Sequence, residues 1–254
     1  MEIIEFTRQL AAEAGVVLAQ AYHQAKHTQQ RESPKALKLA EDKTLDQFIV
    51  ERIQKQYPDH DLLSEERAAI QQGSRYQWII DPIDGSVNFA LHNPFVAISI
   101  ALLVDGQLEL GVIEAPLLGE QFVAQRGGGA TVNGQPLRVS TTNTLSDAYL
   151  LSCDGGMTDR TQVFSTMIRN YYDQVKDLRK LGSAALECAF VAAGRADAYV
   201  TMSIDPWDVA AGVLLIQEAG GQVTTFDGRD WKPQQSDLIC SNGMIHQAIQ
   251  ERLW

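Results

Sequence analysis

The segment that most constrains the fold is a short apolar run that ends in two carboxylates. It reads Trp78-Ile79-Ile80-Asp81-Pro82-Ile83-Asp84-Gly85-Ser86. Apolar residues stopped by Asp-Pro are typical of a buried strand that enters a turn. The proline stiffens that turn, and Gly85 has no side chain, so a ligand can approach the backbone closely. A helix that begins near Ser86 would direct its first amides toward a phosphate oxygen.

The chain after this turn has the pattern of an antiparallel sheet. Asp105-Gly106 is a strong hairpin signal between two apolar segments. Three consecutive glycines at 127–129 lack the spacing of a nucleotide-binding loop, so a turn is the better interpretation. We expect strands over residues 95–104, 108–113 and 121–124.

Helices are expected before this sheet, and mixed elements after it. Apolar residues recur at close to helical spacing over residues 3–25 and again over 43–56, with an exposed polar loop at 27–35. The second half predicts strands over 148–152, 175–178, 198–201, 222–225 and 238–241, and helices over 160–170, 183–193, 206–219 and 244–253. The expectation is one layered α/β domain over 1–254, with sub-domains over 1–145 and 146–254.

The charge balance limits the partners that suit this chain. Its 254 residues have a formal net charge of −11. Nucleic acid and anionic membranes both favour a basic surface, so neither is expected as a partner. An acidic protein also repels a phosphate ester, unless bound divalent cations reverse the local charge.

The cysteines and the apolar runs indicate a cytoplasmic protein. Cys153, Cys188 and Cys240 are far apart and form no CxxC pair, so each is interpreted as a small core residue in a reducing compartment. The charged N-terminus does not fit a signal peptide, and no apolar run reaches the roughly 20 residues of a membrane span.

Two further acidic segments lie far from the first along the chain. They are Leu62-Leu63-Ser64-Glu65-Glu66 and Asp205-Pro206-Trp207-Asp208-Val209-Ala210-Ala211-Gly212. Each has a structural explanation when taken alone. Glu65 suits a solvated loop, whereas Asp205 suits a helix N-cap and Asp208 the positive end of the helix dipole. Clustered carboxylates are also the oxygen ligands that Mg²⁺ prefers.

Together these segments resemble the inositol monophosphatase family of lithium-sensitive, metal-dependent phosphatases. The resemblance runs from about Ile4 to the C-terminus. It includes Leu181-Gly182-Ser183-Ala184-Ala185, Val191-Ala192-Ala193-Gly194-Arg195 and Ser241-Asn242-Gly243. The resemblance implies an α/β (α+β) fold, a five-layer α/β/α/β/α sandwich with the site between its sheets.

The same resemblance implies a site for two Mg²⁺ ions. Glu65 and Asp81 would hold the first ion, together with the main-chain carbonyl of Ile83. Asp81 would bridge to a second ion that Asp84 and Asp208 also bind, and a third, weaker ion near Glu65 is proposed for the family. Such ions allow direct attack by water, without a covalent phospho-enzyme.

The expected catalytic residues are Glu65, Ser86 and Asp42. In the family a threonine hydroxyl and an aspartate position the attacking water, and Ser86 and Asp42 stand at these positions. The usual Val-Thr-Xaa-Xaa-Asp pattern is replaced here by Lys38-Leu39-Ala40-Glu41-Asp42. The structural alternative is that Asp42 caps a helix that begins near Lys43.

Substrate contacts are implied on both sides of the metal site. They involve Asp84, Gly85, Ser86, Gly182, Ser183, Ala184, Thr201 and Asp208. Many inositol phosphatases have a glutamate at the position of Thr201, which is shorter and uncharged. This departure argues against strict inositol specificity.

The predicted function is Mg²⁺-dependent hydrolysis of myo-inositol monophosphate or a similar small sugar or polyol phosphate. Alternatives that share the metal site are a fructose-1,6-bisphosphatase, a histidinol-phosphate phosphatase and a nucleotide bisphosphate or NADP phosphatase. A non-catalytic regulatory binding protein is the alternative from another class, and the presence of all four metal carboxylates argues against it. The resemblance also implies a homodimer.

Overall fold

The computed structural model describes residues 2–24, 40–153 and 160–253. The loop predicted at 27–35 lies outside these ranges. For residues 160–164 the description covers the backbone alone. Within them, none of the helices combines the length and the apolar character that crossing a bilayer requires.

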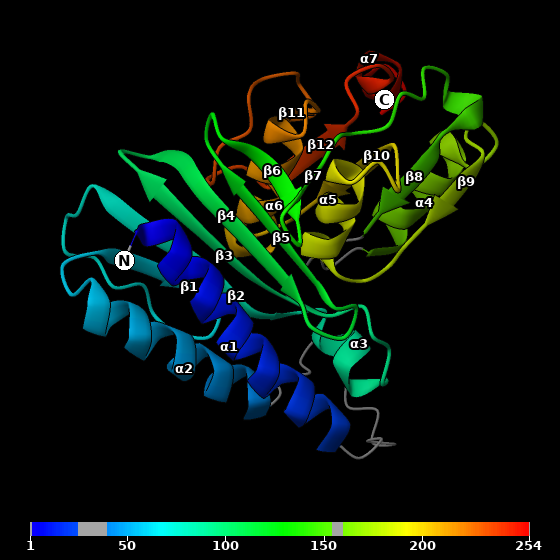
Figure 1. Cartoon of the computed structure of the whole chain (residues 1–254). Helices are drawn as coiled ribbons and strands as arrows, with labels where there is room; N and C mark the ends of the chain where they lie inside the picture. The colour runs from blue at the N-terminus through cyan, green and yellow to red at the C-terminus, as the bar shows by residue number, and fades with distance from the viewer. Residues whose placement is uncertain (1, 25–39, 154–159, 254) are drawn as a thin grey trace.

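A seven-stranded sheet contains the strands of the first half of the chain (Figure 1). Its strands lie side by side in chain order, and all neighbours are antiparallel except β1 and β2, which are parallel. Asp105 and Gly106 both have positive φ, of 50° and 76°, which confirms the predicted two-residue hairpin. The strands are β1 (Asp61–Ser64), β2 (Tyr76–Asp84), β3 (Ala97–Val104), β4 (Gln107–Ala115), β5 (Glu120–Gln125), β6 (Gly129–Val132) and β7 (Gln135–Pro136).

A five-stranded mixed sheet contains the strands of the second half. Its strand order is β11-β12-β10-β8-β9, in which β12 is antiparallel to both neighbours and β8 is parallel to both. The strands are β8 (Tyr149–Ser152), β9 (Asp177–Arg179), β10 (Ala198–Met202), β11 (Gln222–Thr224) and β12 (Asp237–Ser241).

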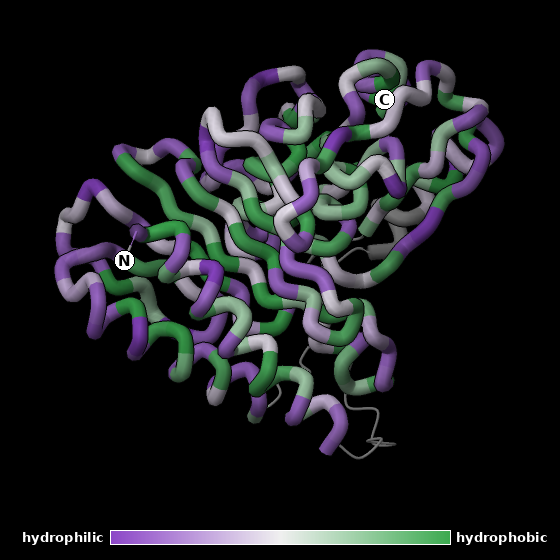
Figure 2. Tube along the Cα trace, in the orientation of Figure 1, coloured by the Kyte–Doolittle hydropathy of each residue, from purple (hydrophilic) through white to green (hydrophobic). Residues whose placement is uncertain are grey.

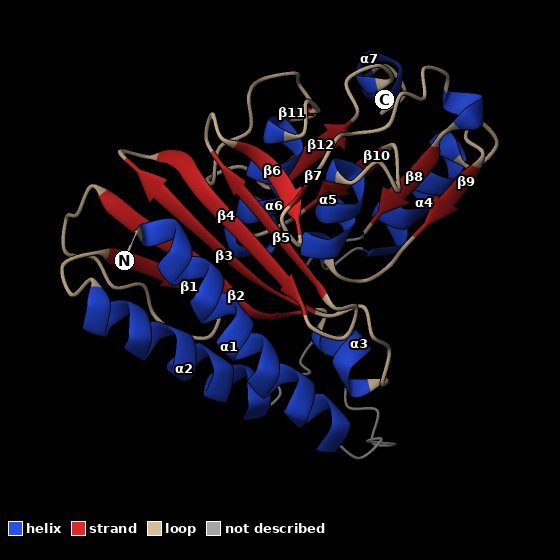
Figure 3. Cartoon of the chain, in the orientation of Figure 1, coloured by secondary structure: helices blue, strands red, loops and turns tan. Residues whose placement is uncertain are grey.

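Three clusters of buried apolar side chains show how the layers stack (Figure 3). One joins α1 and α2 to a face of the large sheet; a second joins the other face to α5, α6 and the small sheet. The third joins the far face of the small sheet to α4 and α7. The helices are α1 (Ile3–Gln24), α2 (Ala40–Gln56), α4 (Arg160–Tyr171), α5 (Ala184–Ala192), α6 (Pro206–Glu218) and α7 (His246–Gln250). This order of layers confirms the predicted five-layer sandwich.

Strand β2 shows why the sequence produces this layering. Trp78 and Ile80 pack in the cluster with α1 and α2, whereas Ile79 packs on the opposite side with α5 and α6. Successive side chains of a strand point to opposite faces, so a strand that is apolar on both faces must lie between two layers. Figure 2 shows apolar residues concentrated along the strands of the large sheet.

Several elements differ from the sequence prediction, among them β6 and β7, which were not expected, and α2, which begins at Ala40. Strand β1 was interpreted only as an apolar run, but Leu62 is buried there and the strand pairs with β2. The last helix begins later than expected, because Oδ1 of Asn242 accepts hydrogen bonds from the amides of Met244 and Ile245. These bonds stabilise a turn ahead of α7.

The first residue of α7, His246, is buried in a network of hydroxyl groups. Its Nε2 lies 2.8 Å from Oγ1 of Thr224, and its Nδ1 lies 2.8 Å from Oγ of Ser241. Thr224 donates its own hydrogen to the carbonyl of Thr225, so it accepts from Nε2 of the histidine, and Nδ1 accepts from Ser241. The neutral ring satisfies both bonds, and burial lowers the pKa of His246 to about 4.

Acid is therefore expected to weaken the fold through His246. Below pH 6.5 the unfolded histidine binds a proton that the folded protein does not bind until about pH 4. We expect this group to lower the free energy of unfolding by roughly 2 kcal/mol between pH 7 and pH 5. Urea unfolding of the wild type and of His246→Gln at both pH values isolates the effect, since the variant keeps every other titrating group. The same pH dependence in both proteins would contradict it.

Candidate metal centre and substrate pocket

The carboxyl ends of β1 and β2 meet at one edge of the large sheet. The strands are parallel with Ser64 opposite Ile80, so Glu65 and Asp81 follow at neighbouring positions. The amide of Glu65 donates to the carbonyl of Ile80 at 3.3 Å. Two acidic residues from separate motifs are thereby placed side by side.

An irregularity in β2 turns two carboxylates toward one side. Asp81 pairs with Ser99 and Asp84 with Ala97, so three steps along β2 match two steps along β3. Residues three apart in a regular strand point to opposite faces, and the extra residue of a β-bulge brings them to the same face. The bulge explains how both carboxylates of the motif reach one site.

The third carboxylate comes from the first turn of α6. The N-cap residue is Asp205, whose amide donates to Oδ2 of Asp208 at 3.0 Å. Oxygen atoms of Asp81, Asp84 and Asp208 all lie within 4.8 Å of one another. Among the residues that the structure describes, this is the one such group of three metal-ligating side chains.

Burial raises the pKa values of these carboxyl groups, and repulsion by neighbouring carboxylates adds to it for two of them. For Asp81 and Asp208 burial is the larger cause, and the neighbouring carboxylates add to it. Burial raises the pKa of Asp84 to about 6, against the opposing effect of its hydrogen bonds. A divalent cation would offset both burial and repulsion, and carboxylate oxygens are the ligands that Mg²⁺ prefers. The donor set therefore fits Mg²⁺.

Two other predicted metal ligands lie around this trio. Glu65 is exposed and lines the pocket described below, and its charge contributes to the raised pKa of Asp81 and of Asp208. Ile83 is buried, and its carbonyl accepts a hydrogen bond from Oγ of Ser86 at 3.1 Å. Glu65 is thus at the mouth of the site, and Ile83 is in its wall.

Helix α2 brings a fifth carboxylate to the site. Asp42 is buried within its first turn rather than at its N-cap, so the structural alternative of a cap is not borne out. Its charge contributes to the raised pKa of Asp81. One turn later Asp46 accepts hydrogen bonds from Oγ of Ser64 at 2.5 Å and from Nε of Arg67 at 2.6 Å. This buried network, which no motif indicated, ties α2 to the end of β1.

The turn after the carboxylates requires glycine. Gly85 has a φ of 95°, and a Cβ there would lie 2.7 Å from the carbonyl oxygen of Phe95. Any side chain would therefore be strained and would clash. The short helix α3 (Ser86–Ala90) begins directly afterwards, as the sequence predicted.

The N-terminus of α5 holds Asp84. The carboxylate accepts hydrogen bonds from Oγ of Ser183 and from the amides of Ala184 and Ala185, at 3.1 and 2.8 Å for the amides. The amide of Gly182 donates to Glu187 at 3.3 Å. The sequence pointed to these amides as substrate contacts, whereas in this structure a carboxylate occupies them, because it lies at the positive end of the helix dipole.

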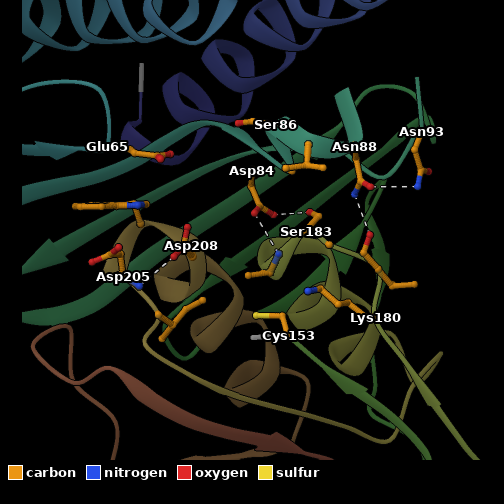
Figure 4. A pocket seen from close by; sticks show the side chains of 17 residues that line it. Glu65, Asp84, Ser86, Asn88, Asn93, Cys153, Lys180, Ser183, Asp205 and Asp208 are labelled. Carbon is orange, nitrogen blue, oxygen red and sulfur yellow. Dashed lines mark hydrogen bonds between the residues drawn. The ribbon is translucent and has the colours of Figure 1, made fainter. Parts of the chain in front are cut away.

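A pocket of about 590 Å³ opens over this cluster. Figure 4 shows side chains from the metal turn, α5 and α6 directed into it. Its lining comprises Glu65, Asp84, Gly85, Ser86, Val87, Asn88, Asn93, Cys153, Lys180, Leu181, Gly182, Ser183, Ala184, Ile204, Asp205, Trp207 and Asp208.

Thr201 is not part of this lining. It has no exposed surface, and its Oγ1 lies 3.1 Å from Sγ of Cys153, which does line the pocket. Cys153 was predicted to be a core residue; instead it is half-buried and separates Thr201 from the pocket. The alternation of side chains along β10 could not reveal the position of Thr201 behind Cys153, since that position depends on the pairing of β10 with the neighbouring strand β8.

Sequence reasoning missed the residues that shape the far side of the pocket. Nδ2 of Asn88 donates to the carbonyls of Phe95 and Leu181, both at 2.8 Å. Oε1 of the fully buried Glu187 accepts from the amide of Leu181 at 2.7 Å. Lys180 precedes this turn and lines the pocket. None of these side chains belongs to a motif, so no sequence signal singled them out.

Comparison with known proteins places this fold and site in a family. The whole chain, residues 1–254, matches the family model described as the inositol monophosphatase family. The chain belongs to the inositol monophosphatase family. The family is metal-dependent, and the buried cluster of this inositol monophosphatase family member can hold a metal.

Similar members of the family have different names. The chain is 36% identical over 249 residues to the fructose-1,6-bisphosphatase/inositol-1-monophosphatase of Thermotoga maritima, covering 98% of this chain and 94% of that protein. It is 38% identical over 248 residues to Nus factor SuhB of Pasteurella multocida, covering 96% and 92%. A solved inositol monophosphatase from Anabaena (Nostoc) is 34% identical with a TM-score of 0.87, covering 98% and 94%.

Proposed function

We propose that this inositol monophosphatase family member is a Mg²⁺-dependent phosphomonoesterase of myo-inositol monophosphate or a similar small sugar or polyol phosphate. The observation that carries the proposal is the close group of the buried Asp81 and Asp84 with the half-buried Asp208, beside a pocket with Glu65 at its mouth. Because the trio joins β2 to α6, we infer that residues 1–254 act as one catalytic domain.

Each residue of the site has an assigned role in this proposal. Two Mg²⁺ ions, with a third near Glu65, would be held by Glu65, Asp81, Asp84, Asp208 and the carbonyl of Ile83. They would activate water and stabilise negative charge on the phosphate and the leaving oxygen. Ser86 donates its hydroxyl hydrogen to Ile83, so its lone pairs are left to accept a hydrogen bond from the attacking water. Asp42, near Asp81, would orient the same water.

The substrate class follows from the pocket and from the names of relatives. A volume of about 590 Å³ suits a sugar or polyol phosphate. The Thermotoga maritima relative is named for both fructose-1,6-bisphosphate and inositol-1-phosphate, so a bisphosphatase activity is the main alternative. Histidinol phosphate and nucleotide bisphosphates or NADP share the same metal chemistry.

A purely regulatory role is the second candidate, because a relative of similar identity is named Nus factor SuhB. A binding protein does not need three carboxylates at close range, since burial and neighbouring charges raise the pKa of Asp81 and of Asp208 and oppose the folded state. Their retention with Glu65, Asp42 and Ser86 favours the catalytic proposal.

A phosphate-release screen tests the proposal. We expect turnover of at least one of these substrates that requires Mg²⁺ and is inhibited by Li⁺. Asp208→Asn should reduce kcat by about 100-fold or more, because it removes one metal ligand. The exposed Asp59→Asn removes the same charge outside the site and should leave kcat unchanged. Wild-type activity toward no substrate, or full activity of Asp208→Asn at saturating Mg²⁺, would contradict the proposal.

A further inference from the structure

The pocket is polarised in charge. Four of its lining residues are acidic: Glu65, Asp84, Asp205 and Asp208. Lys180 is the one cationic residue among the lining side chains that the structure describes. Figure 4 shows it on the side of Ser183 and Cys153, away from Glu65 and Asp205. A ligand that spans the pocket therefore meets Glu65, Asp205 and Asp208 at one end, Asp84 in the middle and an ammonium group at the other end.

Lys180 enters the pocket from a fixed turn. Directly after it, the amides of Leu181 and Gly182 donate to Oε1 of Glu187, at 2.7 and 3.3 Å. The carbonyl of Leu181 accepts from Asn88 at 2.8 Å, and Gly182 has a φ of 81°. These contacts tie the turn to α3 and to α5. The start of the lysine side chain is thus held in place, although its end is exposed.

An anionic ligand has few other favourable partners here. The reacting phosphate belongs over the carboxylate trio, where bound cations would neutralise it. A second anionic group on the same molecule would lie beyond the reach of those ions, in a protein whose net charge is −11. Asp205 would repel such a group at one end of the pocket, whereas the ammonium group of Lys180 would attract it at the other.

The geometry points to Lys180 as a specificity-determining residue that selects substrates with a second anionic group, a phosphate or a carboxylate, beyond the phosphate that is hydrolysed. This inference rests on the proposed phosphatase function. Among the substrates of that function, it favours sugar derivatives that carry a second anionic group, such as the bisphosphates, over myo-inositol monophosphate. Lys180 is given no part in the chemical step, since Figure 4 shows Glu65 and Asp208 on the other side of the pocket, with Asp84 between them and Ser183.

Matched substrate pairs test this inference. Fructose 6-phosphate and fructose 1,6-bisphosphate differ by a phosphate, and glucose 6-phosphate and 6-phosphogluconate differ by a carboxylate. Lys180→Gln should lower kcat/KM by about tenfold, mainly through KM, for the member of each pair with the second anionic group, and leave the other member within about twofold. Lys180→Arg should restore most of the loss. Lys176→Gln, which removes an exposed charge outside the pocket lining, should change neither.

The outcomes separate the two proposals. An equal loss for both members of each pair, or no loss for either, would overturn the role of Lys180. A response in one pair alone would identify the second group as phosphate or as carboxylate. If the wild type hydrolyses nothing, the phosphatase proposal fails. Calorimetric binding of the same four compounds to the wild type and Lys180→Gln, with Ca²⁺ present, then still decides whether Lys180 favours the two compounds that carry a second anionic group.

Discussion

Replacing Asp81 with Asn is expected to stabilise the metal-free protein while abolishing Mg²⁺-dependent turnover. Asp81 is buried beside Asp84 and Asp208, and burial and repulsion raise its pKa well above the ordinary range. Two unit charges about 5 Å apart repel by about 3 kcal/mol at an effective dielectric constant of about 20. Removing one charge should therefore raise the free energy of unfolding in EDTA by at least about 1 kcal/mol. The amide can still accept the hydrogen bond from the backbone of Ile83.

The sign of this effect depends on pH. The pKa of this carboxyl group is higher in the folded than in the unfolded protein. The contribution of the group to stability is therefore fully present at low pH, where it is protonated in both states, and is lost as pH rises through the folded pKa. The gain from Asp81→Asn should therefore be larger at pH 8 than at pH 5. Thermal unfolding in EDTA at the two pH values measures it.

With Mg²⁺ bound, the wild type should become more stable than Asp81→Asn. A ligand at 100 times its dissociation constant stabilises the wild type by about 2.7 kcal/mol, and Asp81→Asn should lose most of this gain. Phosphate release should fall about 1,000-fold or more, since the metal supplies several kcal/mol of transition-state stabilisation. Equal stabilisation of both proteins by Mg²⁺ would exclude Asp81 from the metal site.

Asp46 provides a matched control. It is also a buried aspartate, but Ser64 and Arg67 satisfy its oxygens. Asp46→Asn should therefore destabilise the protein by roughly 1–3 kcal/mol in EDTA, the opposite of Asp81→Asn. If both variants were destabilised, Asp81 would be a paired structural carboxylate instead of one held in place for a cation.

The carboxylates stand where local patterns change, but their role as a metal site was implied only by the family resemblance, since each segment alone has a structural explanation. Asp81 follows an apolar run, and Asp208 lies in the first turn of a helix with Pro206 at its start. The hairpin at Asp105-Gly106 was equally local. What local patterns could not supply was the bulge that turns Asp84 to the side of Asp81, since it exists only in the register with β3.

The substrate side of the pocket escaped prediction for the same reason. The family resemblance placed Thr201 among the substrate contacts. Cys153, which directly follows β8, lies between Thr201 and the pocket. Lys180 carries no motif, and only the packing of Leu181 against Asn88 and Glu187 directs it to the pocket. Long-range contacts determine which residues line the pocket, whereas local patterns mark where the carboxylates stand along the chain.

The second large effect is expected from adding one methyl group between α5 and α6. Gly212 lies where these helices pack, and a Cβ there would lie 2.3 Å from Cβ and 3.0 Å from Sγ of Cys188. Backbone must move to relieve such an overlap, so Gly212→Ala should destabilise the protein by about 3 kcal/mol or more. In a chain of this size that lowers the melting temperature by about 10 °C. An exposed helical glycine would show the opposite, a gain of about 0.5–1 kcal/mol on the same substitution.

Removing the side chain of Cys188 tests whether its overlap with the new Cβ causes the destabilisation. In a Cys188→Gly background the nearest remaining atom to the new Cβ is Cα of residue 188, at 3.7 Å, which is ordinary contact. Gly212→Ala should then be neutral or stabilising, so a double-mutant cycle should give a coupling energy of about 3 kcal/mol. Urea unfolding of the four proteins measures this coupling energy. Additive effects would show that the contact between residues 188 and 212 is not the source of the destabilisation.

The same crossing links stability to the candidate metal centre. The N-terminus of α5 holds Asp84 through Ser183, and α6 carries Asp208, so separating the helices moves two metal carboxylates apart. Gly212→Ala should therefore also raise the Mg²⁺ concentration needed for half-maximal phosphate release, even at temperatures where the variant is folded. The double variant with Cys188→Gly should restore both stability and Mg²⁺ response. Restored stability without restored Mg²⁺ response would mean that the crossing supports the core but does not set the spacing of the carboxylates.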